Sequence, residues 1–245
     1  MERSVYEEMF RIEEIYWWFV AKRKIIIHLI KKTLPKTNFN QNKIDICDLG
    51  CGCGATLKAL GQKYNVWGMD SSDNAVTFCK ERGLEIQKGE LPFNVPYEES
   101  RFDVILMLDV LEHIADDVNT VKKAISLLKP EGIIICTVPA YQWLWSVHDE
   151  IHHHKRRYSK KSFSVLFRLP DVVMLRCNYY NILLFPIAMF DRLKSKFSKK
   201  KKSVRYNPRI VNTIFEKIFA LERYLILRIP LPFGLSLIGV VQRKS

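Results

Sequence analysis

The residues with the clearest chemical potential form a short loop in which glycine occupies every second position. The loop, residues 48–54, is Asp-Leu-Gly-Cys-Gly-Cys-Gly, and it follows a short segment with isoleucine at 44 and 46. A helix-compatible segment, residues 55–63, comes directly after it. Glycine suits such a loop because it tolerates left-handed dihedrals and lets a ligand approach the bare backbone. The pattern predicts a strand that turns into a helix around a bound small molecule.

The glycine spacing excludes two common nucleotide-binding loops. The dinucleotide fingerprint is G-x-G-x-x-G, and the phosphate-binding loop ends in Gly-Lys followed by Ser or Thr. Residues 50–54 have the spacing G-x-G-x-G and match neither pattern. A nicotinamide-dependent oxidoreductase is therefore the weaker alternative for this chain.

Acidic residues stand where further predicted strands end. Asp70, Glu90 and Asp109 end or follow the strands expected at 65–70, 84–87 and 103–108. In an open parallel sheet, ligands bind beyond the carboxyl ends of the strands. We therefore expect these acids and the glycine loop to share one rim of a sheet.

A second chemical cluster lies in the irregular segment 141–158, which is rich in aromatic residues and histidine. His148 and His154 have the chemistry of a general base near neutral pH. Arg156 and Arg157 carry guanidinium groups that pair with phosphate or carboxylate in fork geometry. These residues predict a loop that contacts a substrate. The alternative is a structural ion-pair network that holds the loop over the sheet.

The elements that must position these residues alternate between strands and helices. The remaining strands are expected at 44–49, 133–138, 172–179 and 235–243, and helices at 55–63, 74–82, 116–128 and 160–169. Residues 1–34 are expected to be helical, and residues 183–229 mostly helical. Such alternation predicts an α/β fold with a parallel, doubly wound sheet.

Taken together, these features resemble the class I S-adenosylmethionine-dependent methyltransferase superfamily. Residues 48–54 match its first motif, and residues 109–114, Asp-Val-Leu-Glu-His-Ile, match the motif after the fourth strand. Residues 128–132 match the turn before the fifth strand, with Glu131 where a glycine is usual. The chain also resembles a largely uncharacterised bacterial subgroup of this superfamily, at residues 16–21, 138–149, 154, 156–158 and 232–237.

The resemblance implies a Rossmann-like, doubly wound, mainly parallel seven-stranded sheet with helices on both faces. It also implies a single domain over residues 1–245. The expected parts are an N-terminal helical cap at 1–40, a cofactor-binding core at 41–180, a helical insertion at 181–233 and a final strand at 234–245.

The implied cofactor is S-adenosylmethionine, with S-adenosylhomocysteine as its product. The glycines would pass close to its methionine portion, and Asp48 would orient the loop or meet the ammonium group through water. Asp70 would bind the ribose, because a carboxylate accepts two hydrogen bonds from vicinal hydroxyls. The full set of implied cofactor residues is Asp48, Gly50, Cys51, Gly52, Gly54, Asp70, Ser71, Glu90, Leu91, Asp109 and Val110.

On the substrate side, the predicted catalytic residues are His148, His154 and His113. For His113 the equal alternative is packing under the helix that follows. The predicted substrate-binding residues are Trp18, Tyr141, Asp149, Arg156, Arg157 and Tyr158. The alternative for Trp18 is the apolar face of the first helix. Direct methyl displacement needs alignment and binding more than covalent chemistry by the protein.

The charge of the chain points to anionic partners. The formal net charge is +13, and residues 199–202 are four consecutive lysines. The functional interpretations are an anionic substrate or an anionic membrane surface, and the alternative is a solvated surface. Recognised RNA-binding signatures are missing, so nucleic acid is the least favoured partner. We expect methyl transfer to a small or lipid-linked anionic acceptor, with a non-catalytic S-adenosylmethionine-binding protein as the alternative.

The six cysteines are expected to be reduced thiols in a cytosolic protein. No metal site is expected: Cys47, Cys51 and Cys53 match no common zinc spacing, and residues 152–154 are adjacent histidines that cannot all reach one ion. No apolar run approaches the length of a membrane span. The expected location is the cytoplasm, with peripheral membrane contact and the oligomeric state left open.

Overall fold

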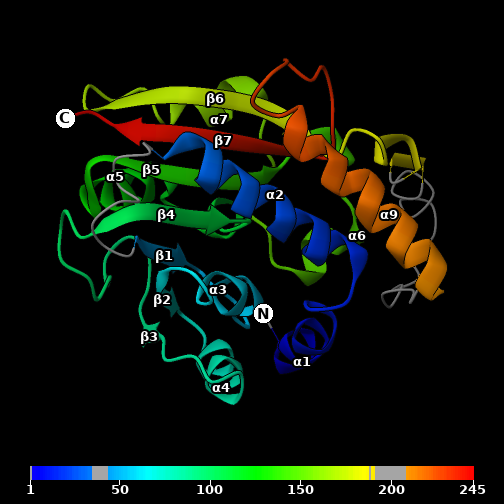
Figure 1. Ribbon diagram of the computed structural model, residues 1–245, viewed down its shortest axis with the longest axis horizontal. Helices are drawn as coiled ribbons and strands as arrows, with labels where there is room; N and C mark the ends of the chain where they lie inside the picture. The colour runs from blue at the N-terminus through cyan, green and yellow to red at the C-terminus, as the bar shows by residue number, and fades with distance from the viewer. Residues whose placement is uncertain (1, 35–43, 188, 191–207) are drawn as a thin grey trace.

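The computed structural model describes residues 2–34, 44–187, 189–190 and 208–245. Its seven-stranded sheet has the order β3-β2-β1-β4-β5-β7-β6 (Figure 1). The strands are β1 (Asp45–Leu49), β2 (Asn65–Asp70), β3 (Gln87–Lys88), β4 (Phe102–Leu108), β5 (Leu128–Pro139), β6 (Val172–Tyr180) and β7 (Ser236–Arg243). β7 is antiparallel to β5 and β6, whereas β1 to β5 pair in parallel. The mainly parallel α/β sheet predicted from the sequence is confirmed.

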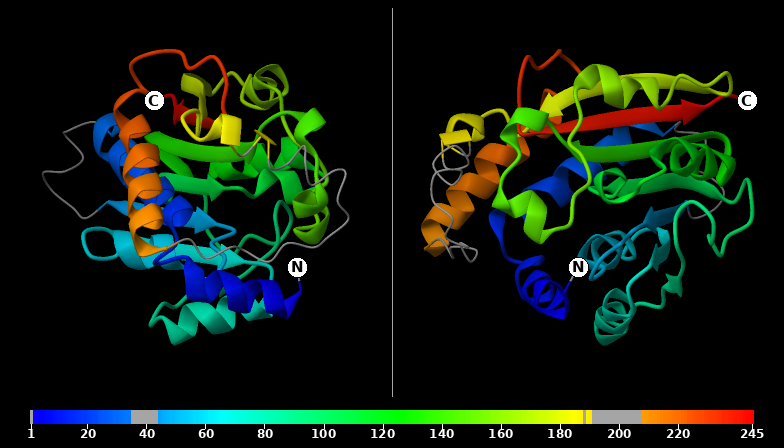
Figure 2. Two further views of the ribbon diagram at one scale, coloured as in Figure 1. Left: turned by 90° about the vertical axis from the view of Figure 1, so that its right-hand side faces the viewer. Right: turned by 180° about the vertical axis from the view of Figure 1, so that it is seen from behind.

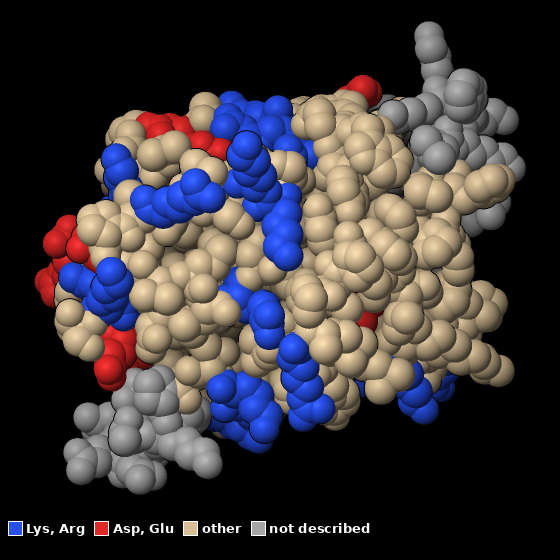
Figure 3. All heavy atoms as spheres, turned by 90° about the horizontal axis from the view of Figure 1, so that it is seen from above, with Lys and Arg blue, Asp and Glu red and all other residues tan. Residues whose placement is uncertain are grey.

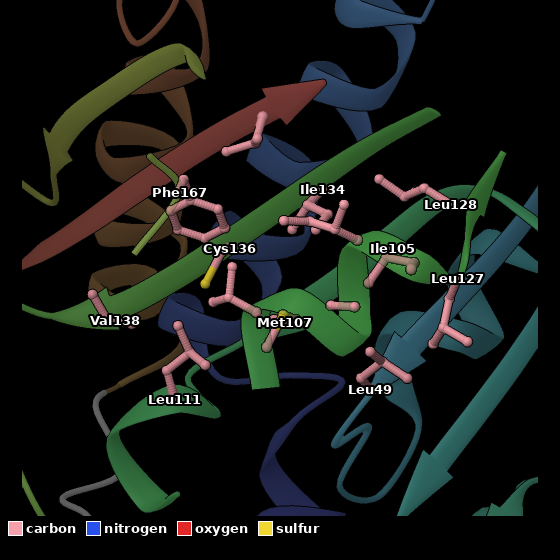
Figure 4. Close-up of a cluster of buried hydrophobic side chains, with 14 of the residues drawn as sticks. Leu49, Ile105, Met107, Leu111, Leu127, Leu128, Ile134, Cys136, Val138 and Phe167 are labelled. Atoms are coloured by element: carbon pink, nitrogen blue, oxygen red, sulfur yellow. The ribbon is translucent and has the colours of Figure 1, made fainter. Parts of the chain in front are cut away.

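Alternate side chains of the central strands supply two separate apolar cores. In β4, Ile105 and Met107 join one core, whereas Val104 and Leu106 join the other. This alternation follows from the two-residue period of a strand. Figure 4 shows the first core, where strand side chains meet Phe167 from beyond the sheet. Burial on both faces explains why these strands are apolar throughout.

Helices cover both faces of the sheet, as the edge-on view in Figure 2 shows. Helices α2 (Trp17–Thr33) and α9 (Arg209–Leu221) pack together over the core that contains Val104, and α5 (Asp117–Ser126) and α7 (Lys160–Val165) cover the other. The other named helical segments are α1 (Arg3–Ile12), α3 (Ala55–Leu60), α4 (Asp73–Glu81), α6 (Val147–Ile151), η2 (Leu111–His113), η3 (Gln142–Leu144) and η4 (Glu222–Tyr224).

Several element boundaries differ from the sequence predictions for local reasons. The helix expected over residues 1–34 is two helices, because the chain turns between α1 and α2. The third strand begins at Gln87 instead of residue 84, since the Leu84 N–H still bonds to the Cys79 carbonyl at the end of α4. Helix α5 ends at Ser126, because Leu128 already pairs with β4.

The predicted helical insertion before the last strand lies partly within the described residues, as α9 and η4. The lysine run 199–202, with Lys194, Lys196 and Arg205, lies outside the described residues. Across the described ranges, no helix combines the length and the hydropathy needed to cross a membrane.

Candidate functional site

The glycine loop turns from β1 into α3 with backbone dihedrals that favour glycine. Gly50 has a φ of 81°, and its N–H donates to the Met69 carbonyl at 2.8 Å. A Cβ atom on Gly50 would lie 2.7 Å from Val110 Cγ2, so a side chain has no room there. Gly54, also with a φ of 81°, caps the start of α3. Conformation and close packing therefore both account for glycine in this loop.

Asp70 ends β2 and holds the glycine loop in place. Its Oδ2 accepts a hydrogen bond from the Gly52 N–H at 3.0 Å, and its Oδ1 accepts one from the Ser72 N–H at 3.0 Å. Burial raises the pKa of Asp70, and these backbone donors offset part of that rise. Each carboxylate oxygen has a second lone pair, which fits the hydrogen bonds expected from two ribose hydroxyls.

Asp48 is buried in β1 beneath the loop. Its Oδ1 has no hydrogen-bond partner among the described residues. Burial raises the pKa of Asp48 to about 7, although the Lys22 ammonium acts to lower it. Buried polar atoms normally have partners. An unpaired oxygen here therefore fits a water or a ligand that carries a donor, such as the expected ammonium group.

The remaining residues expected at the cofactor divide into buried and accessible groups. Val110 and Cys51 are buried, the first directly beneath the loop. Leu91 is half-buried against the core that contains Ile105. Ser71 and Glu90 are exposed. The exposed pair is accessible to a ligand at the rim, whereas the buried residues act through the shape of the loop.

Asp109 forms an ion pair that the sequence did not reveal. Its Oδ2 lies 2.6 Å from Lys22 Nζ, and its Oδ1 accepts a hydrogen bond from Thr137 Oγ1 at 2.9 Å. Burial acts to raise the pKa of Asp109, but the Lys22 charge and these hydrogen bonds lower it overall. The available signal was a lysine within an apolar helical stripe, four residues after Trp18 and three before Ile25. Such a lysine usually has a buried partner.

The first helix covers the glycine loop, which the sequence analysis did not predict. Glu13, just after α1, accepts a hydrogen bond from the Ala55 N–H at 3.2 Å, at the start of α3. Met9 Cε lies 2.8 Å from the position of a Cβ on Gly52. Tyr6 is buried, and burial raises its pKa to about 12. Helix α1 and the residue after it therefore form one wall beside the loop.

The segment 141–158 is held by a buried carboxylate, Asp149. Arg157 donates to it twice, from Nε to Oδ1 at 2.7 Å and from Nη2 to Oδ2 at 3.0 Å. His154 Nδ1 lies 2.8 Å from Oδ1, and the Ser146 N–H donates to Oδ2 at 2.9 Å. Arg157 Nη1 also donates to the Ala140 carbonyl at 3.0 Å. For Asp149 and Arg157, these contacts favour the alternative to substrate contact, which is an ion-pair network that holds the segment over the sheet.

Arg156 and Tyr158 belong to a second network, around Asp117. The Arg156 Nη1 and the Tyr158 hydroxyl both donate to Asp117 Oδ2, at 2.9 and 2.8 Å. Arg156 Nη2 donates to the Ala115 carbonyl at 2.8 Å, and Tyr158 is buried. These contacts favour the ion-pair network, the alternative to substrate contact, for Arg156 and Tyr158 as well.

The structure brings two of the three predicted catalytic histidines together. The rings of His113 and His154 lie edge to face, with centroids 4.7 Å apart. Burial lowers the pKa of His113 to about 4, so its imidazole is neutral near pH 7. His148 is exposed on α6, with its ring centroid 4.1 Å from that of His152 and 6.2 Å from that of His154.

The other two aromatic residues predicted to contact substrate, Tyr141 and Trp18, take different positions. Tyr141 follows β5 at the rim with a φ of 61° and stacks on Tyr179, with ring centroids 5.2 Å apart. The ring centroid of Phe185 lies 6.1 Å from that of Tyr141. Trp18 lies in α2, with Lys22 Nζ 4.9 Å from the centre of its ring. Tyr141 thus belongs to an aromatic cluster at the rim, and Trp18 supports the lysine that pairs with Asp109.

Comparison with known proteins agrees with this geometry. The model of a methyltransferase domain family matches residues 17–173. A ubiquinone biosynthesis O-methyltransferase from Rickettsia prowazekii is 29% identical over 116 residues, which cover 45% of this chain and 45% of that protein. A demethylmenaquinone methyltransferase from Staphylococcus epidermidis is 25% identical over 119 residues, with coverage of 43% and 48%. The chain thus matches just under half the length of these curated relatives.

Solved structures share the fold over nearly the whole chain. The methyltransferase bound to the Haloferax volcanii Trm112 activator has a TM-score of 0.62 at 18% identity, covering 99% of this chain and 94% of that one. The plantazolicin methyltransferase BamL, solved with SAH, has a TM-score of 0.60 at 15% identity, covering 92% and 86%. The family model covers more than half of the chain. The chain therefore belongs to the methyltransferase domain family, and it shares the fold of solved methyltransferases.

Proposed function

We propose that this protein transfers a methyl group from S-adenosylmethionine to a small or lipid-linked acceptor with an aromatic or apolar body. The observation that carries this proposal is the aromatic cluster where β5 ends at the rim. The ring of Tyr141 stacks on that of Tyr179. Between ring centroids, Phe185 lies 6.1 Å from Tyr141 and 5.4 Å from Phe233. Aromatic rings favour apolar and aromatic ligands.

The donor side of the proposal rests on the glycine loop and its neighbouring acids. When bound, the cofactor supplies a sulfonium methyl group that is already activated for direct displacement. Asp70 would hold the ribose, and Asp48 would accept a hydrogen bond from the ammonium group. Lys22 keeps Asp109 ionised at the rim. These residues contribute orientation, which is the main requirement for a direct transfer.

Among the predicted catalytic histidines, His113 and His154 are favoured over His148. The first two meet each other and lie within electrostatic reach of Asp109, whereas His148 is exposed on α6. A proton acceptor is needed only where the acceptor atom carries a proton. The names of the two relatives, which act in quinone biosynthesis, support an acceptor of quinone-like size.

Methyl transfer from labelled S-adenosylmethionine to cell extract tests this proposal. We expect labelled product in the lipid-soluble fraction, and we expect Tyr141→Ala to reduce its rate about 10-fold or more because one stacking partner is lost. Phe93→Ala is the matched control, since Phe93 is 84% exposed in the chain segment after β3.

Two results would contradict the proposal. Labelled product confined to the water-soluble fraction, with full activity in the Tyr141 variant, removes the aromatic or lipid-linked acceptor. Cofactor binding without transfer to either fraction favours the non-catalytic alternative.

We further propose peripheral contact with an anionic membrane surface. Leu183, Ile187 and Phe190 are 50%, 60% and 71% exposed, and they lie just before the basic stretch 194–202 in the chain. Figure 3 shows a stripe of Lys and Arg side chains beside a broad region with few charges. Exposed apolar groups next to basic residues are typical of membrane-surface contact.

Sedimentation with anionic liposomes tests the membrane contact. We expect the wild type to bind, with reduced binding when lysines 199–202 become glutamine or when Leu183 and Ile187 become serine. The control is Val173→Ser, an exposed apolar residue on β6. Absence of binding by the wild type, or equal binding by all variants, would remove this proposal.

A further inference from the structure

Three side chains with metal-binding chemistry meet at the edge of the rim. Glu112 and His113 belong to η2, and His154 arrives from the chain that follows α6. One carboxylate oxygen and one ring nitrogen from each histidine all lie within 4.8 Å of one another. No metal was expected here from the sequence, in which the candidate ligands were the adjacent histidines 152–154 and the cysteines 47, 51 and 53. The fold instead selects one histidine of the 152–154 run and places it against η2.

The carboxylate of Glu112 is the strongest evidence that this cluster binds a ligand. Glu112 is fully buried, and neither carboxylate oxygen has a hydrogen-bond partner on another described residue. The nearby cations are already engaged, since Lys22 pairs with Asp109 and Arg157 with Asp149. A buried carboxylate without a partner is strongly disfavoured, and a bound cation is one way to satisfy it.

The arrangement around His154 is that of a metal ligand with outer support. Its Nδ1 lies 2.8 Å from Asp149 Oδ1, and Asp149 is itself fixed by Arg157. A carboxylate on one ring nitrogen fixes the tautomer and directs the other nitrogen toward the metal. The ring of His113 stands edge to face with that of His154, at 4.7 Å between centroids.

We propose that Glu112, His113 and His154 bind a divalent transition metal ion of the Zn²⁺ type. Two imidazoles and one carboxylate suit Zn²⁺, Co²⁺ or Fe²⁺ better than Mg²⁺ or Ca²⁺, which prefer oxygen ligands. Metal bonds of about 2.1 Å place tetrahedral ligands ~3.4 Å apart, so binding requires small side-chain rotations. Three protein ligands leave a coordination position open for water or a ligand oxygen. With the metal bound, His113 and His154 serve as ligands and not as the proton acceptors favoured above for the metal-free site.

Metal titration of the full chain, after dialysis against a chelator, tests this site. We expect the wild type to bind one Zn²⁺, detected by elemental analysis, and to show a higher melting temperature with Zn²⁺. Co²⁺ should give a visible absorption spectrum of a low-symmetry site. Glu112→Gln and His154→Asn should each weaken binding about 10-fold to 100-fold. His153→Asn is the matched control, because His153 is exposed and has a φ of 55°, which asparagine accepts.

The metal-free melting temperature separates loss of the site from loss of the fold. Glu112→Gln places a neutral amide of similar shape in the same buried position, so we expect its metal-free melting temperature to stay close to that of the wild type while it loses the Zn²⁺ response. Unchanged Zn²⁺ binding by Glu112→Gln, or its loss in His152→Asn alone, would overturn the proposal in favour of the neighbouring pair His148 and His152. No binding by the wild type would also overturn it. Binding is measured without the cofactor, so the outcome is independent of methyl transfer.

Discussion

The glycine loop and the segment 141–158 are both at the rim of the sheet, but different interactions hold them. In the loop, left-handed glycines and backbone hydrogen bonds, such as that from Gly50 to Met69, define the conformation. In the segment, buried side-chain charges do so, with Asp149 paired to Arg157. We therefore expect substitutions that add side-chain atoms to destabilise the loop, and substitutions that remove a charge to destabilise the segment.

Replacement of Arg157 by methionine is the most severe test of this contrast. The change leaves Asp149 buried without its main partner, and we expect a loss of about 3–5 kcal/mol in the free energy of unfolding. Arg156→Met is the control, because Arg156 is 34% exposed in its pair with Asp117 and should cost about 1 kcal/mol or less. Urea unfolding measures both. Equal losses would show that the Asp149 network does not hold the segment.

The carboxyl group of Glu13, in the wall beside the glycine loop, makes the stability of the protein depend on pH. Burial raises the pKa of Glu13 from 4.5 to about 7, although Arg82 acts to lower it. The folded state therefore binds the proton more tightly than the unfolded state. The resulting stabilisation is fully present below pH 4.5 and is lost as the pH rises through 7.

Glu13→Gln should remove this pH dependence. The amplitude is about 3 kcal/mol in the free energy of unfolding, compared at about pH 4 and pH 8. Glu14→Gln is the control, because Glu14 is exposed and the Lys58 side chain lowers its pKa. A steep loss of stability between these pH values that persists in Glu13→Gln would contradict the assignment.

Gly50→Ala tests the packing of the loop. The new methyl group meets Val110, and the alanine backbone must adopt a positive φ. We therefore expect the free energy of unfolding, measured in urea, to fall by ~2–3 kcal/mol. Gly83→Ala is matched for conformation, with a φ of 74° and no atom within 4 Å of the new Cβ. That control should cost only ~1 kcal/mol. Similar losses in both variants would mean that Val110 does not restrict the loop.

Glu131→Gly should produce the smallest effect and the opposite sign. Glu131 has a φ of 64° within β5, where the pairing register with β4 shifts, and this conformation costs a non-glycine residue energy. We expect the free energy of unfolding to rise by about 0.5–1 kcal/mol. The entropy that glycine adds to the unfolded chain offsets part of the relief of strain. Thermal unfolding measures it, and a lower melting temperature would contradict the expected strain.

The fold and the conformation of the glycine loop were predictable because their signals are local. Apolar runs identify the strands, and a glycine at residue 50 or 54 directly reports a left-handed backbone. The side-chain partners were not predictable in this way. Pairing of Lys22 with Asp109, or of Arg157 with Asp149, depends on which residues the fold brings together. The same residue types also fit a substrate contact, so the sequence left both alternatives open for Arg157.

The central claim is that the glycine loop and Asp70 form an S-adenosylmethionine site, and calorimetric titration tests it most directly. We predict that S-adenosylmethionine and S-adenosylhomocysteine bind one per chain, and that NAD(H) does not bind. Asp70→Ala should weaken binding by about 10-fold or more. Asp73→Ala, at an exposed ion pair with Lys88, should leave it unchanged. Binding of NAD(H) alone, or equal affinity in wild type and Asp70→Ala, would contradict the account.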